Sequence, residues 1–196
     1  MGEQLRTQHR LEVPIDIPSN VAELKLHAAL ESVDGIKLVT LTQGDDNLAT
    51  ITLVLRDHLF DMPPISNPSN AQFGTNIRLL GYDFDTQDEQ IDLTLYWQAI
   101  NTPASNYTVF THLVNENGEI VAQVDSPPVG EAWLTSAWLP NEIIVDKRQI
   151  PLPDGLENGR YHFALGLYDN NGRLSVIQDD HLESDDKFIL SPINLE

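Results

Sequence analysis

Apolar and polar residues alternate along several short stretches of the chain. The stretch 91–99 is the clearest, with apolar positions at Ile91, Leu93, Leu95, Trp97 and Ala99. Neighbouring side chains of a β-strand point to opposite faces, so this alternation predicts a strand with one buried face. Trp97 belongs to the apolar set, which indicates a structural role for its ring.

Other stretches show the same alternation, and turn residues separate them. Residues 107–114 and 115–124 form one such pair, and Asn117-Gly118 is the kind of dipeptide that a tight hairpin turn with positive φ angles prefers. The sequence has no sustained helical period. Short strands, regular turns and little helical pattern predict an all-β protein, an antiparallel, immunoglobulin-like β-sandwich.

The opening of the chain repeats part of its end at a constant offset of 137 residues. Gly35 aligns with Gly172, and each glycine follows an Asp or Asn in a predicted two-residue turn. The apolar positions of the preceding strand also align: Leu24, Leu26, Ala28 and Leu30 with Tyr161, Phe163, Leu165 and Leu167. The match runs over roughly 23 positions without a gap, which favours an internal repeat over coincidence.

The repeat divides the chain into three predicted parts. Residues 1–62 correspond to the trailing half of a β module, and residues 71–196 form a complete β-sandwich module. Residues 63–70, which contain proline and serine, predict a linker. A half module exposes an apolar strand face, which costs about 25 cal/mol per Å². We therefore expect residues 1–62 to pack on the complete module or on a neighbouring chain.

The chain is strongly acidic, with 30 Asp and Glu residues against 11 Lys and Arg residues and a formal charge of −19. Such a surface repels phosphate backbones and anionic lipids, so we expect neither nucleic acid nor a membrane surface as a partner. The absence of cysteine excludes thiolate zinc sites, disulfides and a cysteine nucleophile. No stretch approaches about 18 apolar residues, so we expect no membrane insertion by this segment.

Two tryptophans, Trp133 and Trp138, lie in a predicted loop rather than in an alternating strand. A loop indole offers a flat apolar face beside a polar N–H, which suits stacking on a sugar ring or a proline-rich peptide. Asp125, Glu131 and Asp146 are the candidate acceptors for sugar hydroxyls near this loop. The alternative role for either tryptophan is structural, with its ring closing the open end of the sandwich.

Acidic residues cluster after each copy of the repeat, at Asp45-Asp46 and within 179–186. A calcium ion takes about six to eight converging oxygen ligands, and neither loop has the spaced D-x-D-x-D-G arrangement. We interpret both loops as solvated surface, and we predict no metal and no cofactor.

The sequence lacks the motifs of common enzymes. Its six histidines form no H-x-x-H or HExxH pattern, and it has neither a G-x-S-x-G elbow nor a phosphate-binding glycine loop. We expect His112 on one strand to approach Asp125 on the next, a pair without an accompanying nucleophile. The 30 acidic residues supply carboxylates for glycoside hydrolysis, but the sequence singles out no pair.

Three blocks of the second half carry a family resemblance: Gly-Tyr-Asp at 81–83, Leu-Tyr-Trp at 95–97 and Thr-Ser-x-Trp at 135–138. In this order they resemble an uncharacterised β-sandwich module of bacterial envelope proteins, which follows multi-spanning, glycosyltransferase-like membrane regions, sometimes in tandem. The resemblance covers residues 73–196 and implies a non-catalytic domain outside the membrane. Pro140-Asn141-Glu142 departs from the family's Pro-Gly-Glu, but Asn also tolerates the positive φ of such a turn.

These observations favour a non-catalytic accessory or binding module in an extracytoplasmic location, the cell envelope or surface, with envelope carbohydrate as the expected ligand. One alternative is a structural spacer or subunit-pairing domain of a membrane-anchored, glycosyltransferase-like protein, in which residues 1–62 contact another chain. A glycosidase-like hydrolase is the third interpretation.

Overall fold

The computed structural model describes residues 21–26, 29–30, 39–40, 49–54, 58–87, 89–130 and 133–195. The chain forms two compact units, Met1–His58 and Leu59–Glu196. Among the described residues, no helix has the length and apolar character needed to span a membrane.

The described residues of the first unit form two antiparallel strand pairs. Strand β1 (Val21–Leu26) pairs with β4 (Ala49–Val54), and β2 (Ala29–Leu30) pairs with β3 (Val39–Thr40). Three of the four aligned apolar positions, Leu24, Leu26 and Leu30, therefore lie on strands. Ala28, the Asp34-Gly35 turn and Asp45-Asp46 lie outside the described residues. The half-module repeat stays a prediction.

In the part of the second unit that the structure describes, the chain forms thirteen strands and two 3₁₀ turns. Its elements are β5 (Asn67–Pro68), β6 (Gln72–Phe73), β7 (Ile77–Thr86), β8 (Gln90–Ala99), β9 (Thr108–Asn115), β10 (Ile120–Ser126), η1 (Thr135–Ala137), β11 (Ile143–Pro151), β12 (Gly159–Asp169), β13 (Gly172–Arg173), β14 (Val176–Gln178), β15 (His181–Leu182), η2 (Ser184–Asp186), β16 (Phe188–Ile189) and β17 (Ile193–Leu195). The predicted hairpin turn at Asn117-Gly118 joins β9 to β10, which pair antiparallel.

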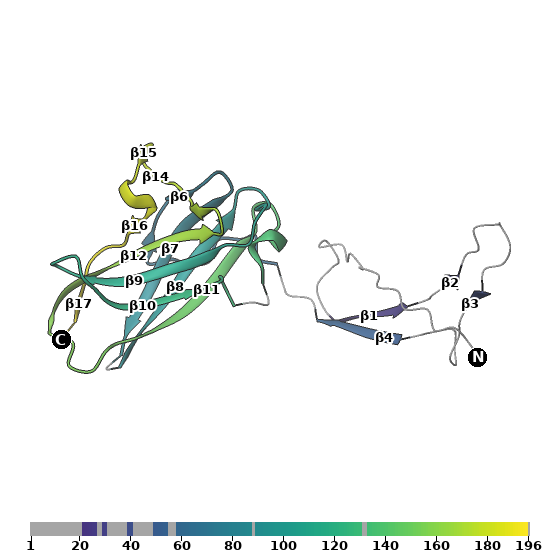
Figure 1. The fold of residues 1–196 in the computed structure, drawn as a ribbon, viewed down its shortest axis with the longest axis horizontal. Helices are drawn as coiled ribbons and strands as arrows, with labels where there is room; N and C mark the ends of the chain where they lie inside the picture. The colour runs from purple at the N-terminus through teal and green to yellow at the C-terminus, as the bar shows by residue number, and fades with distance from the viewer. Residues whose placement is uncertain are drawn as a thin grey trace. The chain divides into compact units, whose positions relative to one another are not determined.

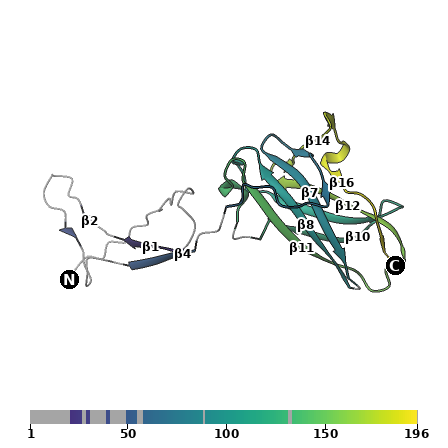
Figure 2. The same cartoon turned by 180° about the vertical axis from the view of Figure 1, so that it is seen from behind.

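These strands form two antiparallel sheets packed face to face. One, the β8 sheet, has the order β11-β8-β7-β6-β14-β15, with β5 also paired to β7. The other, the β9 sheet, has the order β10-β9-β12-β13, with β16 and β17 also paired to β12. The β9 sheet lies in front in Figure 1, and the β8 sheet lies in front when the molecule is turned around in Figure 2. The all-β sandwich architecture predicted from the sequence is confirmed.

The core lies between the two sheets and follows the alternation read from the sequence. All five apolar residues of the 91–99 set are at most 1% exposed, whereas the residues between them are partly exposed. The Trp97 ring meets Phe73 edge-on, with ring centroids 5.3 Å apart. Each buried Leu or Phe side chain contributes about 1.5–3 kcal/mol through removal of apolar surface from water, so this face drives the packing of the sheets.

The chain after β12 runs back and forth between the sheets. Strand β13 pairs with β12 in the β9 sheet, β14 then pairs with β6 in the β8 sheet, and β16 and β17 return to β12. The segment from 172 to 195 therefore contributes pairing strands to both layers.

Residues 63–70, predicted to form a linker, lie instead within the second unit. Asn67 and Pro68 form β5 and pair with Tyr82 and Gly81 of β7. The Ser66 N–H donates to the Asp83 carboxylate (2.7 Å), and the Asn67 side chain donates to the Tyr82 carbonyl (3.1 Å). Proline fits an edge strand because it gives up only one ladder hydrogen bond, so its presence does not distinguish a linker from a strand at a sheet edge.

Candidate ligand-binding surface

A cluster of polar and aromatic side chains lies on the outer face of the β9 sheet. The strand register places Asp125 of β10 beside Phe110 of β9, and Phe110 beside Gly166 of β12. His112 follows two residues after Phe110 on the same face, because side chains alternate along a strand. The carboxylate of Asp125 lies 3.6 Å from the Nε2 atom of His112, which confirms the approach predicted for this pair.

Tyr168 of β12 completes the polar part of this cluster. Its hydroxyl donates to the second oxygen of the Asp125 carboxylate at 3.3 Å. Arg173 of β13 is the register partner of Tyr168, and its guanidinium lies 4.4 Å from the centroid of the Phe110 ring. We call these five residues, Phe110, His112, Asp125, Tyr168 and Arg173, the His112 surface.

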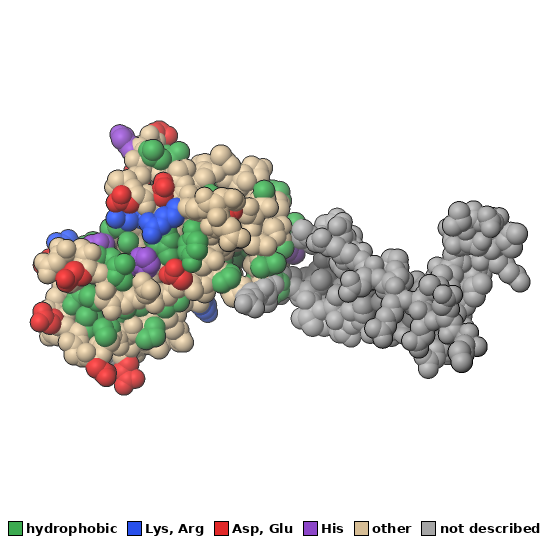
Figure 3. Space-filling model, in the orientation of Figure 1, with side chains coloured by type: hydrophobic (Ala, Val, Ile, Leu, Met, Phe, Trp, Pro, Cys, Tyr) green, Lys and Arg blue, Asp and Glu red, His purple; other side chains and the backbone are tan. Residues whose placement is uncertain are grey.

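A glycine gives the His112 surface its floor. A Cβ atom at Gly166 would lie 2.5 Å from the Phe110 ring and 2.9 Å from the Asp186 carbonyl, so only glycine lets the ring lie against β12. His112 and Phe110 have ring centroids 5.0 Å apart, and Tyr168 lies 6.4 Å from Phe110. Figure 3 shows the resulting face, where basic, histidine and acidic side chains gather beside apolar ones.

The surroundings of His112 favour its neutral form. Desolvation lowers the pKa of the imidazole, and the positive charge of Arg173 lowers it further, while Asp125 acts in the opposite direction. The net pKa lies below the ordinary value of 6.5. Desolvation and the Asp125 carboxylate together raise the pKa of Tyr168, so its hydroxyl stays protonated at neutral pH and can donate a hydrogen bond.

Acidification should weaken the second unit through His112. Because the folded-state pKa lies below the unfolded one, both states carry a neutral imidazole well above pH 6.5, and the unfolded state binds the proton first as the pH falls. Stability is therefore lost as the pH decreases from about 6.5 toward the folded-state pKa. Urea unfolding of the wild type and His112→Gln at pH 7.5 and 5.0 should show a smaller pH-dependent loss in the variant. An equal loss in both proteins would contradict this assignment.

The predicted ligand tryptophans have different surroundings. Trp138 is 0% exposed and belongs to the core, so its ring cannot stack on a ligand. Its ring packs inside the sandwich, and Trp138 therefore has a structural role, the alternative to ligand binding given above. The Thr102 hydroxyl donates to the Trp138 carbonyl at 2.8 Å and fixes the backbone there. Trp133 is partly exposed in the loop between β10 and β11. Of the two, only Trp133 is placed where a ligand can reach it.

Asp146 is also buried and does not face solvent. It is 2% exposed, and its carboxylate accepts hydrogen bonds from Arg148 Nε (2.8 Å) and Trp97 Nε1 (3.2 Å). Its other oxygen accepts from the Val129 N–H at 3.0 Å. Asp146 therefore stabilises the core and anchors a loop, and it is not a free acceptor for sugar hydroxyls. Glu131, the remaining predicted acceptor, lies outside the described residues.

The loop between β10 and β11 is held in a strained conformation by this buried pair. Val129 has a φ of 56°, a region in which β-branched residues are rare, and its N–H is fixed by Asp146. Arg148 donates to the Ser126 carbonyl at 3.1 Å from the same side. Asn141, later in the loop, has a φ of 65°, as expected for an Asn in place of glycine.

A second polar pocket lies on the outer face of the β8 sheet. It has a volume of about 600 Å³ and includes Asp83, Asp85, Asp92 and Lys147. Asp85 and Asp92 are direct register partners, but Gln side chains hydrogen-bond to both carboxylates. Although desolvation alone would raise the pKa of Asp83, hydrogen bonds from Ser66 and Tyr96 lower it, so this carboxyl is ionised at neutral pH and is unsuited to act as a general acid.

The acidic turns near β15 form no metal site in the part of the chain that the structure describes. No group of three or more His, Cys, Asp or Glu side chains converges there on a point that could hold an ion. Asp179, Asp180, Asp185 and Asp186 all have positive φ angles, which Asp tolerates better than most residues. Their role is in turn formation.

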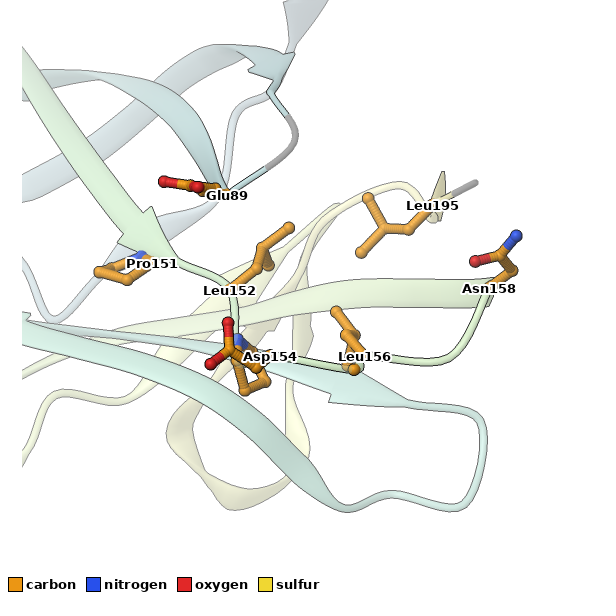
Figure 4. A pocket seen from close by; sticks show the side chains of 9 residues that line it. Glu89, Pro151, Leu152, Asp154, Leu156, Asn158 and Leu195 are labelled. Atoms are coloured by element: carbon orange, nitrogen blue, oxygen red, sulfur yellow. The ribbon is translucent and has the colours of Figure 1, made fainter.

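Another pocket, of about 490 Å³, lies at one end of the sandwich (Figure 4). The close view shows Leu152, Leu156 and Leu195 around it, with Glu89 across from them. Leu152 and Leu156 pack against the core, and Leu195 belongs to it. The pocket is thus the place where the loop between β11 and β12 closes over the core, and its apolar lining has a structural explanation.

Comparison with known proteins found no significant match to this chain among family models, curated proteins or solved structures. The assignment of a site therefore depends on the geometry of the chain itself. Sequence reasoning identified Asp125 and its approach to His112, but it missed Tyr168 and Arg173. Tyr168 sits between the inward positions of the 161–167 alternation and the turn at Gly172, so the period of two already placed it on the outer face.

Proposed function

We propose that this protein is a non-catalytic, extracytoplasmic carbohydrate-binding module that uses the His112 surface. The module is an immunoglobulin-like sandwich and serves as an accessory domain of an envelope protein of the glycosyltransferase-like kind. The observation that carries the proposal is the Asp125 carboxylate, whose side chain is 37% exposed and lies within reach of both His112 and Tyr168.

The chemistry of this surface suits a sugar. Carbohydrate hydroxyls are both donors and acceptors, and a carboxylate can accept two of them while Tyr and His groups donate or accept beside it. Phe110 is 2% exposed and supports the rings of His112 and Tyr168 from below. Those two rings are partly exposed and offer apolar area for the C–H groups of a pyranose. Partly exposed Trp133 supplies a further ring in the loop that follows β10.

Asp125→Asn should weaken glycan binding about tenfold or more, because hydrogen bonds to a charged acceptor are worth about 1.5–3 kcal/mol. A glycan array followed by calorimetry on the best ligand measures this change. Asp85→Asn is the matched control, since it removes an exposed carboxylate from the outer face of the opposite sheet. Both variants should melt within a few degrees of the wild type.

The proposal has clear failing outcomes. A broad glycan panel that yields no binding would overturn it. Equal losses of glycan affinity in Asp125→Asn and Asp85→Asn would show that the glycan does not bind at the His112 surface.

A further inference from the structure

A small pocket continues the outer face of β12 beyond the His112 surface. It has a volume of about 360 Å³, and its lining consists of Glu116, Arg160, His162, Ile189, Leu190 and Pro192. Arg160 and His162 lie on the outer row of β12, together with Ala164, Gly166 and Tyr168, because Tyr161, Phe163, Leu165 and Leu167 point into the core. The pocket and the His112 surface thus share one strand face.

The pocket combines a cationic side chain with an apolar wall. Ile189, at 43% exposed, supplies open apolar surface next to the buried Leu190. Arg160 is exposed, and among the described residues its guanidinium makes no hydrogen bond, and no carboxylate lies within 4 Å of it. A guanidinium that has no partner among the described residues is available to bind a carboxylate in the bidentate geometry that suits it.

Two arginines lie on this face of an otherwise acidic protein, together with Glu116 and Asp125. Arg160 and Arg173 both lie on the outer face of the β9 sheet, on β12 and β13. His162 lies on β12 with Arg160, and His112 lies on the neighbouring strand β9. Electrostatic interactions are screened over about 8 Å at physiological salt, so the formal charge of −19 does not prevent a local cationic group from binding an anion.

We propose that this face binds an acidic polysaccharide and that Arg160 holds the carboxylate of one uronic-acid unit, with the sugar ring against Ile189 and Pro192. The proposal rests on the carbohydrate-binding function above and specifies its ligand class. From Arg160 to Tyr168 the strand covers about 26 Å, at about 3.3 Å per residue, a length that suits a chain of sugars better than a single one. Glu116 provides an acceptor for a hydroxyl of the same unit.

The test compares uronic-acid chains with their own esters. Calorimetry on the full chain would use polygalacturonate, alginate and hyaluronan as probes, and the methyl ester of each as the neutral counterpart. We expect binding of at least one acid chain, about tenfold weaker binding of its ester, and weaker binding as salt increases. Arg160→Gln should lower the affinity for the acid chain about tenfold and leave the ester unaffected.

Lys147→Gln is the matched control, because it removes one positive charge from the outer face of the opposite sheet. Loss of acid-chain binding in Arg160→Gln but not in Lys147→Gln supports the assignment. Equal losses in both variants would indicate a bulk charge effect and overturn it, as would binding to anionic vesicles or nucleic acid in place of the acid chains.

The outcome also separates the two proposals. If neutral glycans bind in an Asp125-dependent manner and Arg160→Gln changes nothing, the acidic ligand class is wrong and the carbohydrate-binding function stands. If no glycan of either kind binds, both proposals fall.

Discussion

Replacing Arg148 with methionine should destabilise the second unit by about 3–5 kcal/mol, because the substitution leaves the Asp146 carboxylate charged and buried without its cation. Asp146 and Arg148 are 2% and 4% exposed and lie between the two sheets. Arg148 also donates to the Val109 carbonyl (3.3 Å) and to the Ser126 carbonyl (3.1 Å), which would lose a donor. Urea unfolding at pH 7 measures the change.

Two further variants separate charge from packing in this prediction. Lys147→Met alters the neighbouring, exposed residue and should change the free energy of unfolding by no more than about 0.5 kcal/mol. The double variant Asp146→Asn/Arg148→Met removes both charges of this pair, and the Asn oxygen can still accept from Trp97. It should therefore recover a large part of the loss. An Arg148→Met protein as stable as the wild type would show that the ion pair is dispensable.

Substituting alanine for Gly81 should cost about 3 kcal/mol, at the upper end of what overpacking usually costs. A Cβ atom at Gly81 would collide with the Asn67 carbonyl, the Ile65 side chain (2.6 Å) and the Pro68 Cα atom (2.9 Å). Since two of these three atoms belong to the backbone, the segment around β5 has to move away from β7. Chemical denaturation measures the loss, and limited proteolysis should detect faster cleavage within 63–70.

Gly118→Ala provides the comparison for this prediction. Both glycines have a positive φ, 154° at Gly81 and 83° at Gly118. Nothing lies within 4 Å of a Cβ atom added at Gly118, so only the conformational penalty of about 1 kcal/mol remains there. Similar losses in the two variants would mean that β5 is not packed tightly on β7, and residues 63–70 would then behave as the linker that their composition predicts.

The strands of the second unit were largely predictable from the sequence, because alternation is a direct consequence of strand geometry. Along Ile91–Ala99 each apolar residue faces the core, and each residue between them is partly exposed. The position of residues 63–70 was not predictable in this way. Proline and serine occur in linkers and in edge strands, and only the contact of Asn67 and Pro68 with the bulged part of β7 distinguishes the two.

The candidate site was less predictable than the fold, for a physical reason that differs from residue to residue. Trp138 lies in a loop, and a loop sequence does not reveal whether it folds back over an open core. For Asp146 the signal was present: Ile144, Asp146, Arg148 and Ile150 alternate with outward residues, so the two charges share the buried face and must pair there. The residues of the His112 surface come from four strands, β10, β9, β12 and β13, and no single segment of the sequence reveals the order in which these strands pair.

The pairing of β6 with β14 has a consequence for the protein's biosynthesis. Phe73 meets Val176, its partner about 100 residues further along the chain, so a ribosome releases one strand long before the other exists. Until then the nascent polypeptide exposes an unpaired strand edge and part of its core, a condition that favours aggregation and chaperone engagement. The β8 sheet of the second unit can therefore complete its pairing only after Val176 has been synthesised.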